Sequence, residues 1–390
     1  MAPDTPRLPP PSRITSDGAR RSPAARQAGA MAGRKHAMVI DHAMRTMIGL
    51  CTAILVAAAL RAADAVFVPI AVALFVTAIL RPVQRGIRSR AGAAVAALAT
   101  MVLALVTLGV LALLSAWAFG RVGQWIIVNA ATLQALYAQK VALLQDAGVP
   151  SETLSGMFDM RLMVRLAQQV TSQLQGILSF TVVTLVFVIL ALLEVDVARR
   201  QLEALRGSPG AAALLRAATR TGTKLRAYMA VRTVMSILTG LAVWAFASAM
   251  GLELAEEWGL IAFVLNYIPF IGPFVATVLP AAFAALQFGT WQVAATVFAA
   301  LQVIQFLSGS YIEPRLAGRR LAVSPFLVLV AVFLVAFLWG IIGALVGVPI
   351  LIAILCICEE FEQSRWAARL LSGLDADTAV PPAPREAGSA

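Results

Sequence analysis

Apolar and charged positions along this chain separate into long blocks rather than alternating. Most of the charge-free blocks are long enough to cross the ~30 Å hydrocarbon core of a bilayer as a helix. Leu, Ala, Val and Ile fill them without strict alternation, which does not fit the strands of a β-barrel. The pattern predicts an all-α, polytopic helical membrane protein with about eight membrane-embedded segments. The charge-free runs are 46–60, 65–80, 91–120, 166–193, 233–252, 258–312 and 321–358.

The run 258–312 would measure roughly 80 Å as one helix, far more than a bilayer needs. It is interrupted by Asn266-Tyr-Ile-Pro-Phe-Ile-Gly-Pro273. We expect a re-entrant helical hairpin that enters from outside, turns at 269–273 and leaves at 287–290, followed by a full crossing to Ile312. The run 321–358 is broken near Gly340 and forms either two spans or a second hairpin. The C-terminal half should therefore hold one or two broken, re-entrant hairpins.

Composition supports a membrane protein, because 60% of the residues are hydrophobic and only 13% are charged. The net charge of +11 could indicate nucleic-acid binding in a soluble protein. Here the basic residues gather at 81–90 and 194–232, which follows the positive-inside rule and makes nucleic acid an unnecessary partner. Both termini are then cytoplasmic, and the acidic cluster at 253–257 lies outside.

The same pattern divides the chain into regions. Residues 1–40 form a disordered basic tail, and 41–193 form a transmembrane scaffold with extracytoplasmic amphipathic helices at 121–165. Residues 194–232 are predicted to be cytoplasmic amphipathic helices, 233–360 the transport core with interrupted helices, and 361–390 a mostly disordered cytoplasmic tail.

Several kinds of chemistry are excluded or lack support. The cysteines at 51, 356 and 358 lie in apolar runs without the spacing of a metal site, and both histidines precede the first apolar run. A Walker phosphate loop is absent from the sequence, so ATP is not the direct energy source. We therefore expect no catalytic site, no metal and no cofactor.

The candidate transport residues lie at the interruptions. Pro lacks an amide hydrogen and Gly permits positive φ, so both release backbone groups that can face a cavity and hold a polar solute. Asn266 adds a donor and an acceptor; a static packing kink is the alternative. The residues predicted on this basis are Asn266, Pro269, Gly272, Pro273, Gly340, Gly343 and Pro349.

The crossing 290–312 carries a second polar set. Gln302, Gln305 and Ser308 are three residues apart and share roughly one face, which turns toward either a cavity or a neighbouring helix. Glu313 precedes Pro314 at the end of the crossing. Its carboxylate either pairs with a nearby arginine, among 315, 319 and 320, or binds a coupling ion.

From about Asp196 to Glu359 the chain carries a dense series of motifs in a fixed order. They are Trp258-Gly259, Asn266-Tyr-Ile-Pro-Phe-Ile-Gly-Pro273, Pro280, Ile312-Glu-Pro-Arg-Leu-Ala-Gly318, Ser324-Pro325, and Trp339-Gly-Ile-Ile-Gly343 through Val348-Pro349. This series resembles the autoinducer-2 exporter family of bacterial transporters. One departure is Glu256-Glu257, where the family pattern has apolar residues before Trp-Gly.

The resemblance implies a secondary transporter of the bacterial cytoplasmic (inner) membrane that acts as a homo-oligomer. Three functions remain open. The first is export of a small polar solute such as autoinducer-2 by alternating access, driven by a proton, sodium or solute gradient. The second is a sodium/proton antiporter, with Glu313 as the ion ligand. The third is a membrane scaffold that transports nothing.

Overall fold

The computed structural model describes residues 44, 46–135, 138, 160–205, 207–317 and 324–371. Residues up to Ala62 belong to a unit of their own, which contributes the short apolar helix Thr46–Ala62. The second unit begins at Ala63 and holds the rest of the described fold. Its elements are α2 (Asp64–Ala91), α3 (Ala93–Val128), α6 (Met160–Ala204), α7 (Pro209–Ala249), α8 (Ala255–Leu265), α9 (Ile271–Phe288), α10 (Trp291–Phe306), η1 (Leu307–Ile312), α11 (Glu313–Ala317), α12 (Pro325–Glu360) and α13 (Arg365–Leu371).

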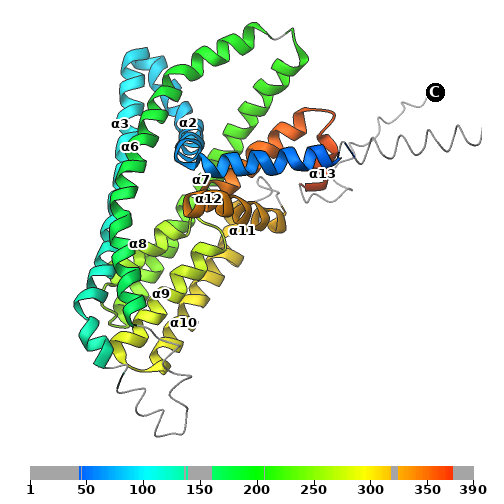
Figure 1. The fold of residues 1–390 in the computed structure, drawn as a ribbon. Coiled ribbons are helices and arrows are strands. Elements are labelled where there is room, and N and C mark those ends of the chain that lie inside the picture. Colours follow the sequence, from blue (N-terminus) through cyan, green and yellow to red (C-terminus); the bar gives the residue numbers. More distant parts are fainter. Residues whose placement is uncertain are drawn as a thin grey trace, which may run out of the picture. The chain divides into compact units, whose positions relative to one another are not determined.

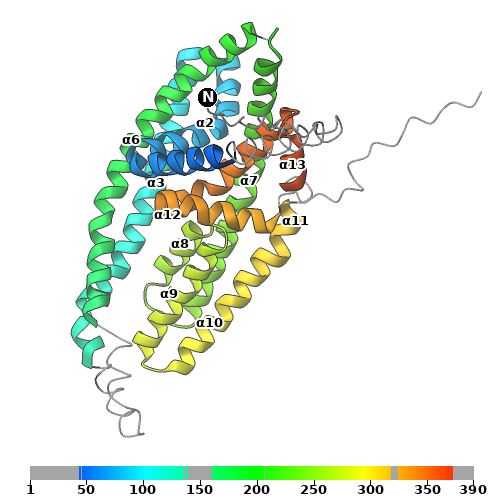
Figure 2. The same ribbon diagram turned by 45° about the vertical axis from the view of Figure 1, so that its right-hand side comes forward.

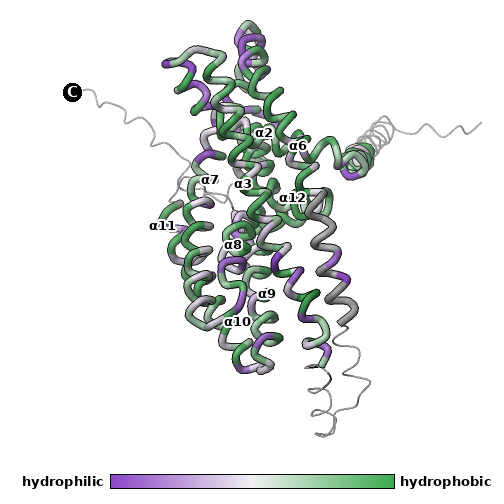
Figure 3. The backbone as a smooth tube through the Cα atoms, turned by 90° about the vertical axis from the view of Figure 1, so that its left-hand side faces the viewer, coloured by the Kyte–Doolittle hydropathy of each residue, from purple (hydrophilic) through white to green (hydrophobic). Residues whose placement is uncertain are grey.

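All the regular structure among the described residues is helical, which confirms the all-α prediction. Seven described helices are long and apolar enough to cross a membrane. Figure 3 shows hydrophobic residues predominating along α2, α3, α6 and α12. The side chains on their outer faces are exposed leucines, valines and phenylalanines, for which lipid is the favourable surrounding.

The long helices α3 and α6 lie side by side, with α2 packed against both (Figure 1). Helix α3 continues beyond residue 120 to Val128, so the start of the predicted amphipathic segment is the end of this helix. Most of the remainder of 121–165, and the tails 1–40 and 372–390, lie outside the described residues. Residues 194–204 and 209–232 are continuations of α6 and α7 rather than separate helices.

The interruption at 266–270 separates α8 from α9, and the two helices form a hairpin. A Cβ at Gly272 would overlap the carbonyl oxygen of Leu265, so the arms touch backbone to backbone just beyond the turn. Helix α8 also packs closely on α7, because a Cβ at Gly259 or Gly240 would collide with the opposite helix. The predicted turn at 287–290 is present and is closed by Gly289, with φ 63°.

Helix α12 is also a hairpin rather than a continuous rod. Trp339 and Gly340 have non-helical backbone angles, and Gly340 has φ 64° and ψ −148°, a region open mainly to glycine. A Cβ at Gly343 would overlap the carbonyl of Val335, and Gly347 lies against Ala331, so the two arms run back along each other. The run 321–358 thus forms two packed arms, an arrangement that fits both two spans and a second hairpin.

The three helices α8, α9 and α10 run as neighbours, and α12 crosses one end of this group (Figure 2). The turns 250–254 and 289–290 lie together at the other end. There the Gln287 side chain joins them, donating to the carbonyl of Gly251 at 2.9 Å and accepting from the amide of Glu253 at 2.9 Å. The α8–α9 hairpin and the α12 hairpin meet at the opposite end of the group, which carries the turn 266–270.

Candidate functional site

A row of polar residues follows one face of α7 and faces the two interrupted regions. We call this row the polar seam; it comprises Tyr228, Arg232, Thr233, Ser236 and Thr239. Successive members are three or four residues apart and so share a helix face, except that Thr233 directly follows Arg232. Ser236 and Thr239 are fully buried. Buried hydroxyls in an apolar helix are costly unless they have hydrogen-bond partners, so the partners of these residues indicate the role of the seam.

The tip of the α8–α9 hairpin contacts the seam. Asn266 is buried and donates from Nδ2 to the Ser236 hydroxyl at 3.4 Å. Tyr267 donates its hydroxyl proton to Thr233 at 3.1 Å. These two bonds tie the end of α8 to the middle of α7. They place the Asn266 amide, predicted from sequence to serve a solute, in a buried polar contact.

The backbone of the tip is strained. The amide of Ile271 donates to the carbonyl of Pro269 at 2.7 Å, and Phe270 between them has φ 64° and ψ −56°. This is the rare γ-turn with positive φ, which costs about 1–3 kcal/mol at a residue other than glycine. Pro269 is buried at the turn and Pro273 lies in the first turn of α9. The sequence prediction of an interrupted backbone here is correct in position.

On the other side of the seam, α10 changes into the π-helix η1. π-helical turns are rare and occur frequently at functional sites. Ser308 in η1 is buried. Glu313, the residue after η1, pairs with Arg232: its two carboxylate oxygens lie 3.2 Å from Nη2 and 3.3 Å from Nη1. The partner of Glu313 is therefore on α7. Of the arginines expected from the sequence, Arg315 lies instead over the Tyr311 ring, 3.8 Å from its centroid, and 319 and 320 are outside the described residues.

Four polar atoms around the seam are buried without a hydrogen-bond partner among the described residues. They are Tyr228 Oη, Arg232 Nε, Thr239 Oγ1 and Gln305 Nε2. Two of these groups are hydroxyls that can donate and accept, and the other two are N–H donors, so together they could bind hydroxyl and carbonyl groups. Leaving such atoms unpaired costs about 1–3 kcal/mol each.

Apolar packing closes the space between the tip and α12. Ile268 packs with Val332, Ala344 and Val348 from both arms of α12, and Tyr228 of the seam belongs to the same cluster. The hairpin tip and the arms of α12 thus meet through aliphatic side chains.

Other predicted residues lie away from this meeting point. Gln302 is exposed on α10, whereas Gln305 is half-buried, so the expected common face of amides is divided. Pro314 is exposed. Gly340 is exposed at the α12 turn, where the adjacent Trp339 packs on α2 and α6 in a separate cluster, while Gly343 and Pro349 are buried in the second arm.

The acidic group at 253–257 is bonded rather than simply solvated. Glu257 is buried and accepts a hydrogen bond from Arg121 Nε of α3 at 3.0 Å. Glu253 accepts from the Trp125 indole at 2.5 Å, and Glu256 remains exposed. Glu257, one of the two acids at which the chain departs from the family pattern, thus links α8 to α3.

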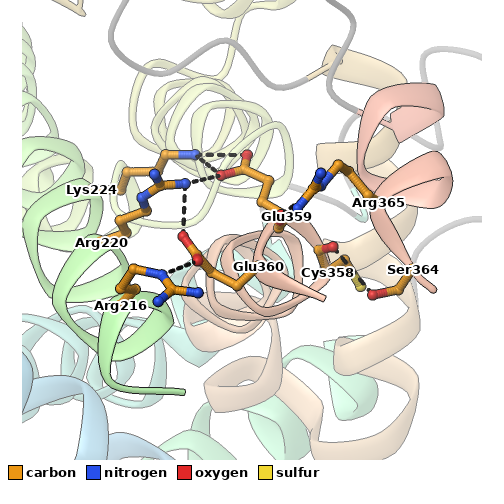
Figure 4. Close-up of polar contacts among 8 residues, drawn as sticks. All are labelled: Arg216, Arg220, Lys224, Cys358, Glu359, Glu360, Ser364 and Arg365. Carbon is orange, nitrogen blue, oxygen red and sulfur yellow. Dashed lines mark hydrogen bonds and ion pairs between the residues drawn. The ribbon is translucent and has the colours of Figure 1, made fainter. Parts of the chain in front are cut away.

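A second charged cluster fixes the end of α12 to α7 (Figure 4). Glu360 lies 2.7 Å from Arg216 and 2.8 Å from Arg220, and Glu359 lies 3.1 Å from Lys224. Arg220 also approaches Glu359, at 3.9 Å, so one arginine bridges both acids. The cations lie one helical turn apart on α7 and form a single row. This cluster anchors the second arm of α12 at the end opposite its turn.

The α7 residues of the seam were not predicted from the sequence. Arg232 was counted among loop charges, and Ser236 and Thr239 were hidden inside an apolar run. The signal that could have found them is the spacing Tyr228, Arg232, Ser236, Thr239, which marks one polar face. Within the described ranges, no group of three or more His, Cys, Asp or Glu side chains could hold a metal ion.

Comparison with known proteins gives a consistent result. The profile of the AI-2E family transporters matches residues 50–363. The AI-2 transport protein TqsA of Escherichia coli K12 is 29% identical over 337 residues, covering 85% of this chain and 96% of that protein. A putative transport protein of Haemophilus influenzae is 25% identical over 341 residues, covering 85% and 97%. A putative transport protein of Borreliella burgdorferi is 27% identical over 203 residues, covering 52% and 56%.

Proposed function

We propose that this chain, which belongs to the AI-2E family of transporters, exports a small polar solute across the bacterial inner membrane through the polar seam of α7. Autoinducer-2 is the first solute to test, because the relative TqsA is named for AI-2 transport. The proposal includes a homo-oligomer with both termini in the cytoplasm.

The observation that carries the proposal is the set of unpartnered buried polar atoms between two interrupted helices. Membrane proteins tolerate irregular backbone at depth where it is buried in protein or lines a cavity. Transporters commonly place their substrate site at such breaks. Here the γ-turn at 269–271 and the π-helix 307–312 flank the same face of α7. Tyr228 and Thr239 on that face, and Gln305 on α10, have free hydrogen-bonding capacity.

In the alternating-access cycle that we propose, the aliphatic contact of Ile268 with α12 is the closed gate. Separation of the α8–α9 tip from α12 exposes the seam to one side of the membrane. A solute with several hydroxyl groups then replaces the missing partners of the seam. A proton, sodium or solute gradient drives the cycle.

The sodium/proton antiporter is a less favoured alternative. Glu313 is the carboxylate nearest the seam, but both guanidinium ends of Arg232 already bind it. A sodium ion would have to displace this arginine, at the cost of leaving a buried cation unpaired. The third alternative, a scaffold, gives the buried unpartnered groups no role.

The test uses the full-length chain in liposomes loaded with autoinducer-2, under imposed proton and sodium gradients. Ser236→Ala and Asn266→Leu should reduce autoinducer-2 flux roughly tenfold, equivalent to about 1.4 kcal/mol for the lost buried bond. Ser115→Ala is the matched control, because the Ser115 hydroxyl bonds only within its own helix, to the carbonyl of Leu111 at 2.7 Å.

Three results would contradict the export proposal. Flux that is equal in Ser236→Ala and Ser115→Ala would remove the seam from the pathway. Sodium-dependent proton flux without any solute, abolished by Glu313→Gln, would establish the antiporter instead. Complete absence of flux for autoinducer-2, sodium and protons would favour the third alternative, a membrane scaffold.

A further inference from the structure

A cavity lies where α2, α6, α7 and the last turns of α12 come together. Its volume is about 490 Å³, within the range of small-molecule sites. The walls are mostly aliphatic, from residues such as Leu74, Leu202 and Ile357. Neither the seam nor the two hairpin turns contribute to its lining, so this cavity needs a separate explanation.

The cavity is lined by four arginines and no acidic residue. These are Arg81, Arg85, Arg199 and Arg226. Two carboxylates lie close by: Glu203 accepts from Arg199 at 2.7 Å, and Asp196 is shared between Arg81 and Arg88. The positive charge around the cavity therefore exceeds the negative charge that the described residues supply.

Arg81 is only partly satisfied. Its Nη2 lies 3.6 Å from Asp196 Oδ1, which is longer than a hydrogen bond, and both Nε and Nη2 are buried without a hydrogen-bond partner in the described part of the chain. Thr77, one turn earlier on the same face of α2, is buried with an equally unpartnered hydroxyl. Partly satisfied buried cations are costly, so an anion in the cavity would remove a penalty that the empty fold carries.

Arg226 is held in position across the cavity. It donates from Nη1 to the carbonyl of Ala78 at 3.2 Å and from Nη2 to the Thr223 hydroxyl at 3.2 Å. The space beside it depends on Gly222, because a Cβ there would lie 3.2 Å from Arg226 Nη1. A larger side chain at this position would enter the cavity and displace the guanidinium group.

We propose that this cavity binds a phosphate group attached to an organic moiety. Several guanidinium groups around one space match a phosphate group, because each guanidinium can form paired, charge-assisted hydrogen bonds with phosphate oxygens. The aliphatic walls suit the carbon portion. The group could belong to a soluble phosphate ester or to an anionic phospholipid headgroup, and the chemistry of recognition is the same. This inference is independent of the proposed export function.

The test has a soluble arm and a lipid arm, both with the full-length chain purified in detergent and stripped of lipid. Calorimetry measures binding of inorganic phosphate and glycerol 3-phosphate. Native mass spectrometry measures retention of phosphatidylglycerol against phosphatidylcholine. The variants are Arg81→Gln and Gly222→Leu; Arg90→Gln is the matched control, since Arg90 is an exposed cation in the last turn of α2 that does not line the cavity. Thermal melting and size exclusion identify the variants that remain folded.

We expect wild type and Arg90→Gln to bind one of the two ligand kinds, and the folded cavity variants to lose roughly tenfold or more in affinity. A loss of affinity for the soluble ligands identifies a phosphate ester, and a loss of phosphatidylglycerol retention identifies a phospholipid. Binding in neither arm overturns the proposal. An equal loss in Arg90→Gln also overturns it, because the attraction would then be general surface charge.

Discussion

At the scale of single residues, backbone contact explains the key glycines better than conformational freedom does. Neither Gly272 nor Gly343 is among the glycines with positive φ, yet each lies where a Cβ would overlap a carbonyl of the opposite arm. The sequence predicted both positions as breaks that free the backbone. The structure shows them just after the break, as the points where the two arms touch.

Gly272→Leu should abolish transport because the new side chain would have to displace the carbonyl of Leu265. Overpacking of this kind costs about 1–3 kcal/mol and would shift the tip away from the seam. The measurement is solute flux in liposomes, together with membrane insertion and oligomeric state, which should remain normal.

The matched control for this variant is Gly109→Leu. A Cβ at Gly109 meets nothing within 4 Å, so the same substitution should leave flux near the wild-type value. Normal flux in Gly272→Leu would show that the close contact of the arms has no part in transport.

Several contacts of the site could not have been predicted from residue types alone. The sequence identified Asn266 and Glu313 as polar residues near breaks, but their partners Ser236 and Arg232 lie 30 and 81 residues away. Pairing over such separations is decided by how α7 packs on α8 and η1, and local patterns carry no information about it. The sequence therefore offered only nearby arginines or a coupling ion as partners of Glu313.

At the scale of elements, helix boundaries near charges were harder to predict than the apolar runs themselves. Helices α6 and α7 extend into the basic stretch 194–232, which was expected to form separate helices, and they are divided only near Gly207-Ser-Pro-Gly210. The reason is physical: arginine and lysine favour helix, so leaving the apolar zone does not end a helix without a glycine or proline.

The ion-pair cluster at the end of α12 should stabilise the attachment of this element to α7. In the double variant Glu359→Gln/Glu360→Gln, three cations on one face of α7 would lose their counter-charges. The Glu360 side chain is only 7% exposed, so we expect a loss of about 1–3 kcal/mol and a lower melting temperature. Hydrogen exchange should increase over the last turns of α12.

The control for this prediction is Glu362→Gln, which removes an exposed carboxylate two residues further on. Its melting temperature should equal that of the wild type within experimental error, because exposed charges usually contribute little to stability. If the double variant melts at the wild-type temperature, the cluster in Figure 4 does not hold α12 in place.

At the scale of the whole chain, charge asymmetry predicts orientation in the membrane. Basic residues gather where α2 meets α3 and α6 meets α7, while the acids at 253–257 lie near the α7–α8 turn. By the positive-inside rule, we expect the α6–α7 turn on the cytoplasmic side and the α9–α10 turn on the external side.

Single cysteines test this orientation after the native cysteines at 51, 356 and 358 are replaced. Thr290→Cys in the α9–α10 turn should react with a membrane-impermeant maleimide in intact cells, since Thr290 is exposed. Ser208→Cys, exposed in the α6–α7 turn, should react only after permeabilisation. Labelling of both from the same side would contradict the predicted topology.

The close contact between the two arms of the α8–α9 hairpin restricts how the molecule can move. Because the two arms touch through their main chains, they have no room to slide past each other, and the hairpin is expected to move as one rigid unit. Gly251 and Gly289, both with positive φ, lie at its far end, where the Gln287 side chain joins the two connecting turns. Any rotation of this unit would therefore pivot at that end, and the largest displacement would fall on Asn266 and Ile268, beside the polar seam.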